Sequence, residues 1–153
     1  MFAYRIADAR HPIFDSTGAM LHGGRWNSIG KRIIYAAETY AGALLEVLVH
    51  ANLSQPPRNH RVVRIDIPDG TTIENIRLHA VEGWDAEDMV VSRAFGDQWI
   101  QEARSAVLRV PNLETQGREH NLVINTDQPQ FTLITAGKTE AIAWDARLFP
   151  PAK

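Results

Sequence analysis

The feature that most constrains this chain is a succession of a glycine-arginine turn, a short strand and an apolar helix within residues 22–50. The turn reads His22-Gly-Gly-Arg-Trp-Asn-Ser28, and its two glycines can take positive φ or let the backbone approach a neighbouring group closely. The segment 32–37 that follows is β-branched and aromatic, which predicts a buried strand. Arg25, Tyr35 and Glu46 thus fall in three different kinds of local structure. Only folding can bring them together, so we expect a pocket built from turn, strand and helix.

The helix predicted over residues 40–50 carries its carboxylate on a narrow face. Thr39 is a residue type that caps helices. Glu46 lies on the same side as Gly42 and His50, at i−4 and i+4. The wide apolar face gathers the residues Ala41, Leu44, Leu45, Leu48 and Val49. A helix of this kind is normally buried, and an unpaired buried carboxylate is costly. Glu46 therefore has either an arginine partner in a structural salt bridge or a catalytic purpose.

Arg25 and Tyr35 each allow a functional and a structural interpretation. A guanidinium beside two glycines is suited to bind phosphate or carboxylate through paired hydrogen bonds, or it is a solvated arginine of a hairpin loop. Tyr35 can stack on a planar ring or offer its hydroxyl to a ligand, or it is part of the core. Spacing alone leaves both alternatives open.

Length and composition exclude several classes of protein. With 153 residues we expect a single domain over residues 1–153. The net charge of −2 and the scattered basic residues give no electrostatic footprint for nucleic acid. The absence of cysteine excludes disulfides, thiol nucleophiles and cysteine-ligated metals. No signal peptide or membrane-spanning run is visible, so we expect a soluble, cytoplasmic protein.

The rest of the chain is rich in short strands. A second helix is expected at residues 92–104, where Phe95, Trp99 and Ile100 follow a helical spacing although Gly96-Asp97 weakens it. The acidic segment 82–88 is expected to be a solvated surface loop. Strands are predicted at residues 2–6, 61–68, 72–77 (a short edge strand), 106–111, 119–125, 131–135 and 141–148. This pattern favours an α+β fold with small central β-sheets and a few helices over a regular βαβ series.

The sequence lacks the common motifs of metal and nucleotide sites. Its six histidines form neither an H-x₃-H nor an H-E-x-x-H pattern, so no metal site is expected. The glycine pair at residues 23–24 does not begin a P-loop, no G-x-G-x-x-G opens a helix, and no G-x-S-x-G nucleophile elbow occurs.

Motifs spread along nearly the whole chain resemble the RES-domain family, the toxins of bacterial RES–Xre toxin–antitoxin pairs. The Gly-Gly-Arg-Trp-Asn turn together with the Glu46 helix is the most specific of them. The matching elements are Tyr4-Arg5, Gly23-Gly-Arg-Trp-Asn27, Ile34-Tyr35-Ala-Ala-Glu38, Leu44-Leu-Glu46-Val-Leu-Val-His50, Gly83-Trp84, Gly96-Asp97-Gln-Trp99, Leu108-Arg-Val-Pro111, Glu119-His-Asn-Leu-Val-Ile-Asn125 and Asp145-Ala-Arg-Leu148.

This resemblance implies an ADP-ribosyltransferase-like fold and an enzyme that consumes NAD as its substrate without a metal. Glu46, Arg25 and Tyr35 match the family's functional residues, and Trp26 and Asn112 are expected to help bind NAD. Glu46 would stabilise the ribosyl cation, Arg25 would bind the pyrophosphate, and Tyr35 would pack against the nicotinamide or its ribose. The implied partner is an Xre-type helix-turn-helix antitoxin, with homodimerisation left open and no direct contact with nucleic acid or membrane.

One position departs from the family pattern. The family's serine ends a Val-Pro-Ser element, and in this chain that position is Asn112. Asparagine still donates and accepts hydrogen bonds, and Ser105 and Ser92 are the alternatives. The change leaves three functions open: cleavage of NAD by hydrolysis or phosphorolysis, ADP-ribosyl transfer to a protein, or a catalytically weak module that binds NAD or the antitoxin.

Overall fold

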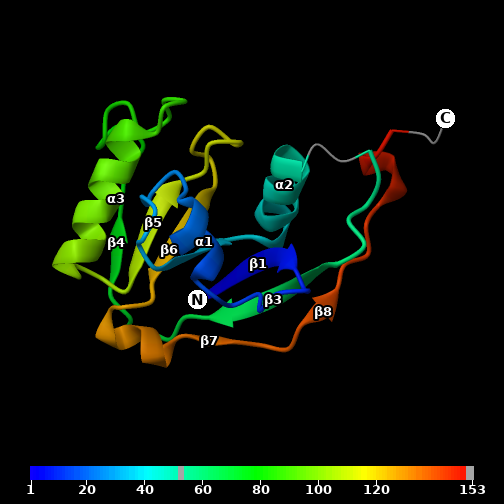
Figure 1. Ribbon diagram of the computed structural model, residues 1–153, viewed down its shortest axis with the longest axis horizontal. Coiled ribbons are helices and arrows are strands. Elements are labelled where there is room, and N and C mark those ends of the chain that lie inside the picture. Colours follow the sequence, from blue (N-terminus) through cyan, green and yellow to red (C-terminus); the bar gives the residue numbers. More distant parts are fainter. Residues whose placement is uncertain (52–53, 151–153) are drawn as a thin grey trace.

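The computed structural model describes residues 1–51 and 54–150 (Figure 1). Its strands form one eight-stranded sheet in the order β4-β5-β6-β2-β1-β3-β7, with β8 paired to β3. The strands are β1 (Phe2–Asp8), β2 (Ile33–Ala37), β3 (His60–Asp66), β4 (Ile73–Asn75), β5 (Val107–Pro111), β6 (His120–Asn125), β7 (Thr135–Ala136) and β8 (Glu140–Ala141). The helices are α1 (Thr17–His22), α2 (Tyr40–Ala51) and α3 (Val90–Glu102), with the 3₁₀ helices η1 (Pro129–Leu133) and η2 (Ala146–Leu148).

The sheet divides between β1 and β2. These two strands share a single aligned pair, Tyr4 with Ala37, whereas β1 pairs with β3 along its whole length and β2 does the same with β6. The two groups of strands consequently run in different directions (Figure 1). Arg5 bridges the division, because its Nη1 donates to the Tyr35 carbonyl and its Nε to the Ile13 carbonyl, both at 2.7 Å. Where small central sheets were expected, the structure thus has one sheet whose two halves are joined by a single aligned pair.

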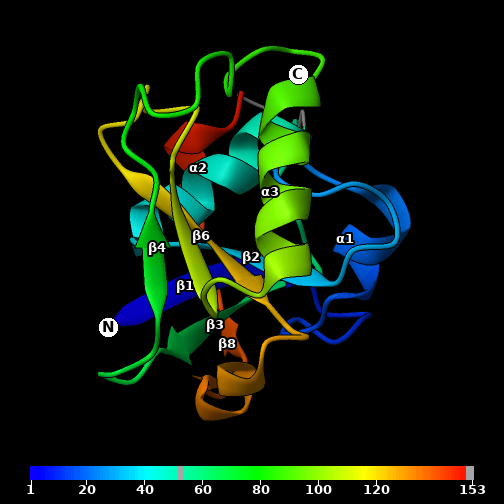
Figure 2. The same ribbon diagram turned by 90° about the vertical axis from the view of Figure 1, so that its left-hand side faces the viewer.

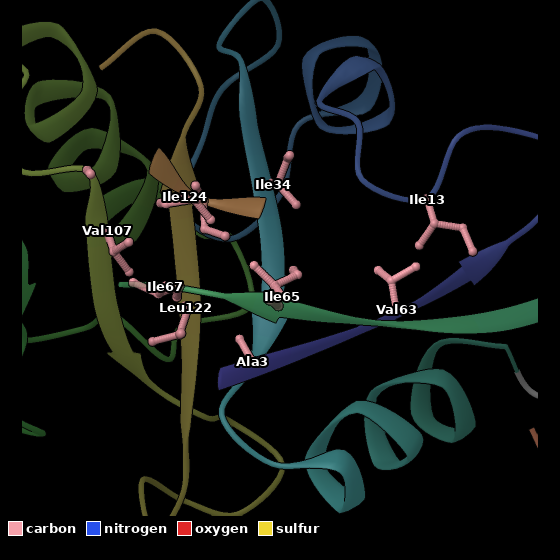
Figure 3. Close-up of a cluster of buried hydrophobic side chains, with 12 residues drawn as sticks. Ala3, Ile13, Ile34, Val63, Ile65, Ile67, Val107, Leu122 and Ile124 are labelled. Carbon is pink, nitrogen blue, oxygen red and sulfur yellow. The ribbon is translucent and has the colours of Figure 1, made fainter. Parts of the chain in front are cut away.

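The alternation of side chains along β2, β5 and β6 separates two cores. On one face, the β1–β3 half crosses over these strands, as Figure 3 shows, and encloses Ala3, Ile34, Val63, Ile65, Ile67, Val107, Leu122 and Ile124. On the opposite face, α3 packs its Trp99 and Ile100 over the other alternating set, which consists of Ile33, Leu108, Val110 and Val123. Burial of both faces explains why these strands read as continuous apolar runs.

Helix α3 lies along one side of the sheet (Figure 2) and needs a glycine in its middle. A Cβ on Gly96 would come within 1.9 Å of the Trp26 carbonyl oxygen. Its neighbour Asp97 accepts a hydrogen bond from the Ser28 backbone N–H at 2.9 Å. The pair that weakens the helical pattern in the sequence is therefore the contact between α3 and the turn that carries Arg25.

The predicted apolar face of α2 is not its most buried face. Helix α2 contacts β1 and β2, and the side that meets them carries the buried Gly42, Ala43 and Val47. Val49 is 54% exposed. Small residues let the helix approach the strands closely, and Glu46 is drawn inward with them. The cap was predicted correctly, since Thr39 Oγ1 accepts from the Gly42 N–H at 2.9 Å.

Two predicted strands were wrong. The predicted strand 131–135 is not formed as such: Pro129 starts the 3₁₀ helix η1, whose first turn is capped by the Gln128 side chain, and only Thr135 belongs to a strand, the two-residue β7. Residues 141–148 form only the end of β8 and the 3₁₀ helix η2, capped by the Asp145 side chain. In both 3₁₀ helices the side chain before the turn accepts from one free N–H, Gln128 from Gln130 and Asp145 from Arg147, which favours the helical turn over a strand. Helix α1 was not predicted from the sequence.

The α+β class is confirmed, because helices and strands are interspersed along the chain but every strand pair except β4 with β5 is antiparallel, unlike a regular βαβ series. The edge strand predicted within residues 72–77 is β4, which lies at one end of the sheet and is parallel to β5. Among the described residues no helix is both long and apolar enough to cross a membrane.

Candidate active site

A cavity of about 520 Å³ opens where β1 and β2 diverge. Its walls come from β1, β2, α2, the turn at residues 23–26 and the segment 110–114 that ends β5. Four predicted site residues line it: Arg25, Trp26, Tyr35 and Glu46. A second hollow, of about 680 Å³, is lined by parts of the segment 78–85 with Leu113 and Gln116, and it contains none of the predicted residues.

Glu46 is held from both sides. Its Oε1 accepts from Asn121 Nδ2 on β6 at 2.6 Å and from Asn112 Nδ2 at 3.4 Å. Its Oε2 meets Nε2 of His50, one turn along α2, at 3.1 Å. An arginine is not among these partners, so the structural salt bridge considered from sequence is not the arrangement found. The carboxylate instead accepts hydrogen bonds from two side-chain amides, those of Asn112 and Asn121, which together form a cradle for it at the cavity wall.

Asn112 is a buried connector, with 1% of its surface exposed. Its Nδ2 donates to Asn121 Oδ1 at 3.2 Å in addition to Glu46, and its Oδ1 accepts from the Thr115 backbone N–H at 2.8 Å. It therefore contacts the carboxylate rather than lining the cavity. Of the alternatives, Ser105 is bonded to Trp99 and to the Val107 carbonyl at the start of β5, and Ser92 donates to the Met89 carbonyl in α3. Asn112 is thus the candidate that reaches Glu46.

A second carboxylate, Glu114, faces Glu46. One ligand-type atom from each of Glu46, His50 and Glu114 lies within 4.8 Å of the others. Burial raises the pKa of Glu46, and the charge of Glu114 raises it further, while Asn121 and His50 act in the opposite direction. Carboxylates and histidine are also ligand types for cations, so these are the side chains that could hold one.

Tyr35 is fixed by its hydroxyl. The Oη donates to Asn27 Oδ1 at 2.8 Å and accepts from the Trp26 backbone N–H at 2.9 Å. A Cβ on Gly24 would lie 2.6 Å from this oxygen, which explains the second glycine of the turn. Burial raises the pKa of the Tyr35 phenol, so the hydroxyl stays neutral. Tyr35 thus anchors the turn and leaves its ring, rather than its hydroxyl, for a ligand.

Arg25 lines the cavity from the turn at residues 23–26 and forms hydrogen bonds to the segment 82–88. Its Nη1 donates to the carbonyl oxygens of Trp84 and Ala86, both at 2.9 Å. Trp84 is buried and stacks on Trp26 with ring centroids 6.2 Å apart. The acidic residues of this segment are exposed, as expected of a solvated loop. Trp84 is instead a core residue, and the segment supplies the carbonyl acceptors for Arg25. Arg93 of α3 holds the same turn through the Gly24 carbonyl at 2.8 Å.

Trp26 contributes to the wall but packs inward. Only 2% of it is exposed, and its ring contacts Trp84 and Phe95. Its position indicates support of the turn, and direct binding of a ligand by Trp26 stays a prediction.

Three further residues of the site were not singled out from sequence. Arg5 lines the cavity beside the division of the sheet, and burial lowers the pKa of its guanidinium. Asn121 and Glu114 complete the surroundings of Glu46. Asn121 lies beside His120 at the polar start of β6, so its sequence position does not set it apart. Glu114 lies in a loop and carries no periodic signal.

The fold and this cavity define a class of protein that comparison with known sequences identifies. Residues 2–145 match the family described as the RES domain, so the chain belongs to the RES-domain family. A "Prs ADP-ribosylating toxin" of Sphingobium sp. (strain YBL2) is 39% identical over 161 residues, which cover 97% of this chain and 97% of that protein. "Toxin Res" of Pseudomonas putida (strain KT2440) is 32% identical over 152 residues, 97% of this chain and 100% of that protein.

A solved structure has the same fold. A chain in the crystal structure of the M. tuberculosis MbcT–MbcA toxin–antitoxin complex superposes with a TM-score of 0.74 and 19% identity. The likeness covers 90% of this chain and 81% of that chain. The resemblance predicted from the motifs is confirmed at the level of family and fold.

Proposed function

We propose that this protein is the toxin of a toxin–antitoxin pair, a single RES domain that acts by breaking the nicotinamide–ribose bond of NAD. The observation that carries the proposal is a cradled, partly buried carboxylate, Glu46, in one cavity with Arg5 and Arg25. The cavity volume of about 520 Å³ falls within the usual range for ligand sites. An ADP-ribosylating relative with 39% identity supports the same substrate.

The chemistry requires a carboxylate and no strong acid. The nicotinamide–ribose bond breaks through a ribosyl cation with oxocarbenium character, and nicotinamide leaves as a neutral molecule. By analogy with glycoside hydrolysis, a fixed carboxylate beside the ribose stabilises this cation. Glu46 has this role, and the amides of Asn112 and Asn121 fix its orientation.

The two arginines suit the anionic part of NAD. Arg5 and Arg25 donate to backbone carbonyls instead of carboxylates, so their positive charge is not neutralised by these contacts. Arg25 binds the pyrophosphate, and a charge-assisted hydrogen bond of this kind contributes about 1.5–3 kcal/mol. The ring of Tyr35 packs against the nicotinamide or its ribose, and Trp26 supports the turn that presents Arg25.

The acceptor of the ribosyl group distinguishes two candidate activities. Water or phosphate would make the protein an NAD glycohydrolase or an NAD phosphorylase. Transfer to a protein is the second candidate, which the name of the Sphingobium relative favours. Labelled NAD separates them, because transfer leaves the label on a macromolecule and the other reactions leave it on small molecules.

An antitoxin is the proposed partner. The solved neighbour with the same fold comes from a toxin–antitoxin complex, and we propose an Xre-type antitoxin whose C-terminal end enters the cavity. Addition of the antitoxin should then abolish NAD consumption, and removal of its C-terminal end should restore it. Inhibition by the shortened antitoxin would argue for a different surface.

The direct test is nicotinamide release from NAD by the purified protein, free of partner, with and without phosphate. Loss of NAD in both buffers supports a hydrolase, and loss that requires phosphate supports a phosphorylase. The rate should survive a chelator, because the reaction proposed here needs no Lewis acid. Bound but unchanged NAD in every buffer, with no label on any added protein, would contradict an enzymatic function.

A further inference from the structure

Glu114 is an ionisable group in the cavity that the bond-breaking step does not use. It lines the same cavity as Glu46, and the two carboxylates lie within the 4.8 Å cluster described above. Its Oε2 is buried and has no hydrogen-bond donor among the described residues. A carboxylate oxygen withdrawn from water without a donor is costly. A proton or a donor group supplied by a bound ligand would satisfy this oxygen, which no described residue does.

Asn112 connects the loop that carries Glu114 to Glu46. Asn112 donates to Glu46 with its Nδ2, and its Oδ1 accepts from the Thr115 N–H. The Asn112 carbonyl accepts from the Gly117 N–H at 2.8 Å, where Gly117 takes a φ of 77° that favours glycine. One residue thus fixes both the carboxylate on α2 and the turn that presents the carboxylate on the loop.

The geometry points to Glu114 as the general base of this site, which accepts the proton of a neutral acceptor as that acceptor attacks the ribosyl carbon. This inference rests on the proposed function and adds a second carboxylate to it. The bond from the ribosyl carbon to the nicotinamide nitrogen breaks, and its electron pair leaves with nicotinamide. A bond forms from the acceptor's oxygen or nitrogen to the same carbon. The acceptor's proton passes to Glu114 Oε2 and then to solvent.

The same arrangement specifies the class of acceptor. Water, a hydroxyl and a neutral amine each carry a proton that must be removed, and Glu114 can remove it. Inorganic phosphate is already anionic and would approach two carboxylates, a like-charge approach that is unfavourable in a partly buried site. The inference therefore favours hydrolysis or transfer to a protein side chain over phosphorolysis.

Chemical rescue tests this role. Azide is a nucleophilic anion that has no proton to lose, so it needs no base. We expect Glu114→Gln to lower the turnover number for nicotinamide release about 100-fold, within the range for general base catalysis, while the affinity for NAD is retained. Azide should then restore release by this variant and form an azide adduct of ADP-ribose, detected by mass spectrometry. Azide should not restore release by Glu46→Gln, which lacks the group that stabilises the cation.

The controls separate base catalysis from charge and folding. Glu140→Gln removes one negative charge from the exposed strand β8, outside the cavity, and should behave as the parent. Glu114→Asp keeps a carboxylate and should retain more activity than Glu114→Gln. Its activity tests the role of Glu114 even if the glutamine variant does not fold. Thermal melting of each variant confirms that it is folded.

The outcomes distinguish this inference from the function it rests on. Release by the parent together with parental release by Glu114→Gln would overturn the role of Glu114 and leave the proposed function standing. Failure of azide to rescue a folded Glu114→Gln would also overturn it. Absence of release by the parent in every buffer, together with no label on any added protein, would contradict the proposed function itself, and this inference with it.

Discussion

Asn121 Nδ2 lies 2.6 Å from Glu46 Oε1 and donates a hydrogen bond from β6 to α2, across 75 positions of sequence. This bond joins the strand half of the cavity to the helix that carries the carboxylate. Asn121 pairs with Ala37 and Val110 in the sheet, so its position is set by two ladders at once. The orientation of Glu46 thus depends on the register of β6.

Removal of the Asn121 amide should lower the activity by loosening the orientation of the Glu46 carboxylate, while the carboxylate itself stays in place. Asn121→Ala deprives Glu46 of its shortest hydrogen bond, and loss of a hydrogen bond to a charged group corresponds to about 1.5–3 kcal/mol. We expect nicotinamide release to fall about 10- to 100-fold, measured as the turnover number at saturating NAD. Asn75→Ala, on the exposed edge strand β4, is the matched control. Parental turnover by Asn121→Ala would show that the cradle is not needed.

The hydroxyl of Tyr35 should matter for stability. Tyr35→Phe leaves the Trp26 N–H and Asn27 Oδ1 without their partner, and buried groups left unpaired cost about 1–3 kcal/mol each. We expect the free energy of unfolding, from urea titration, to fall by at least about 1 kcal/mol. Tyr40→Phe, on a tyrosine that is 38% exposed, should change it little. Equal stability of the two variants would contradict the anchoring role of Tyr35.

The contact between α3 and the Arg25 turn gives a prediction at Gly96. Gly96→Ala would place a methyl group against the Trp26 carbonyl, and overpacking of this kind costs about 1–3 kcal/mol. Gly18→Ala is the matched control, because nothing lies within 4 Å of its Cβ. We expect a lower melting temperature for the first variant only. A Gly96→Ala protein as stable as Gly18→Ala would mean that the turn moves freely against α3.

Gly24 and Gly96 show how much of the fold and the site could be predicted from the sequence. The Gly-Gly-Arg turn, the helix with Glu46 and the α+β class follow from local pattern and family motifs, and the structure or the comparisons support them. The reason for Gly24 is the Tyr35 hydroxyl and the reason for Gly96 is the Trp26 carbonyl, and both are contacts between segments distant in sequence. Local pattern carries no information about such contacts.

The misassigned segments have the same kind of cause. The leucines of α2 form the more apolar face, yet Gly42, Ala43 and Val47 face the strands, because close approach requires small side chains there. Residues 131–135 have strand-forming side chains, but Gln128 and Pro129 begin a 3₁₀ turn before them. Glu114 could not be recognised because only the Asn112 turn brings its loop to Glu46.

The pH dependence of the reaction should reflect the pKa of Glu46. Burial and the charge of Glu114 raise this pKa, so the carboxyl keeps its proton to a higher pH than an exposed glutamate, whose pKa is about 4.3. In the proposed mechanism only the ionised carboxylate stabilises the ribosyl cation, so turnover should rise with pH through the raised pKa. The other ionisable side chains that line the cavity are Tyr4, Arg5, Arg25, Tyr35, His50 and His60.

NMR titration of the side-chain carboxyl carbons tests whether this rise in turnover with pH follows the ionisation of Glu46. The pKa of Glu46 should lie above that of exposed glutamates in the parent, and it should fall in Glu114→Gln because the neighbouring charge is gone. Turnover that rises as the pH is lowered, or a Glu46 pKa unaffected by Glu114→Gln, would contradict this electrostatic account.

The central claim is that Glu46 is the group that makes NAD cleavage possible, and Glu46→Gln tests it most directly. Glutamine keeps the size of the side chain and an oxygen that can accept from Asn121, but it cannot offset the charge of the ribosyl cation. We predict that nicotinamide release falls about 100- to 1,000-fold, as for loss of a group that stabilises transition-state charge, while the melting temperature at neutral pH does not fall. Release at the parental rate by the folded Glu46→Gln protein would contradict the assignment.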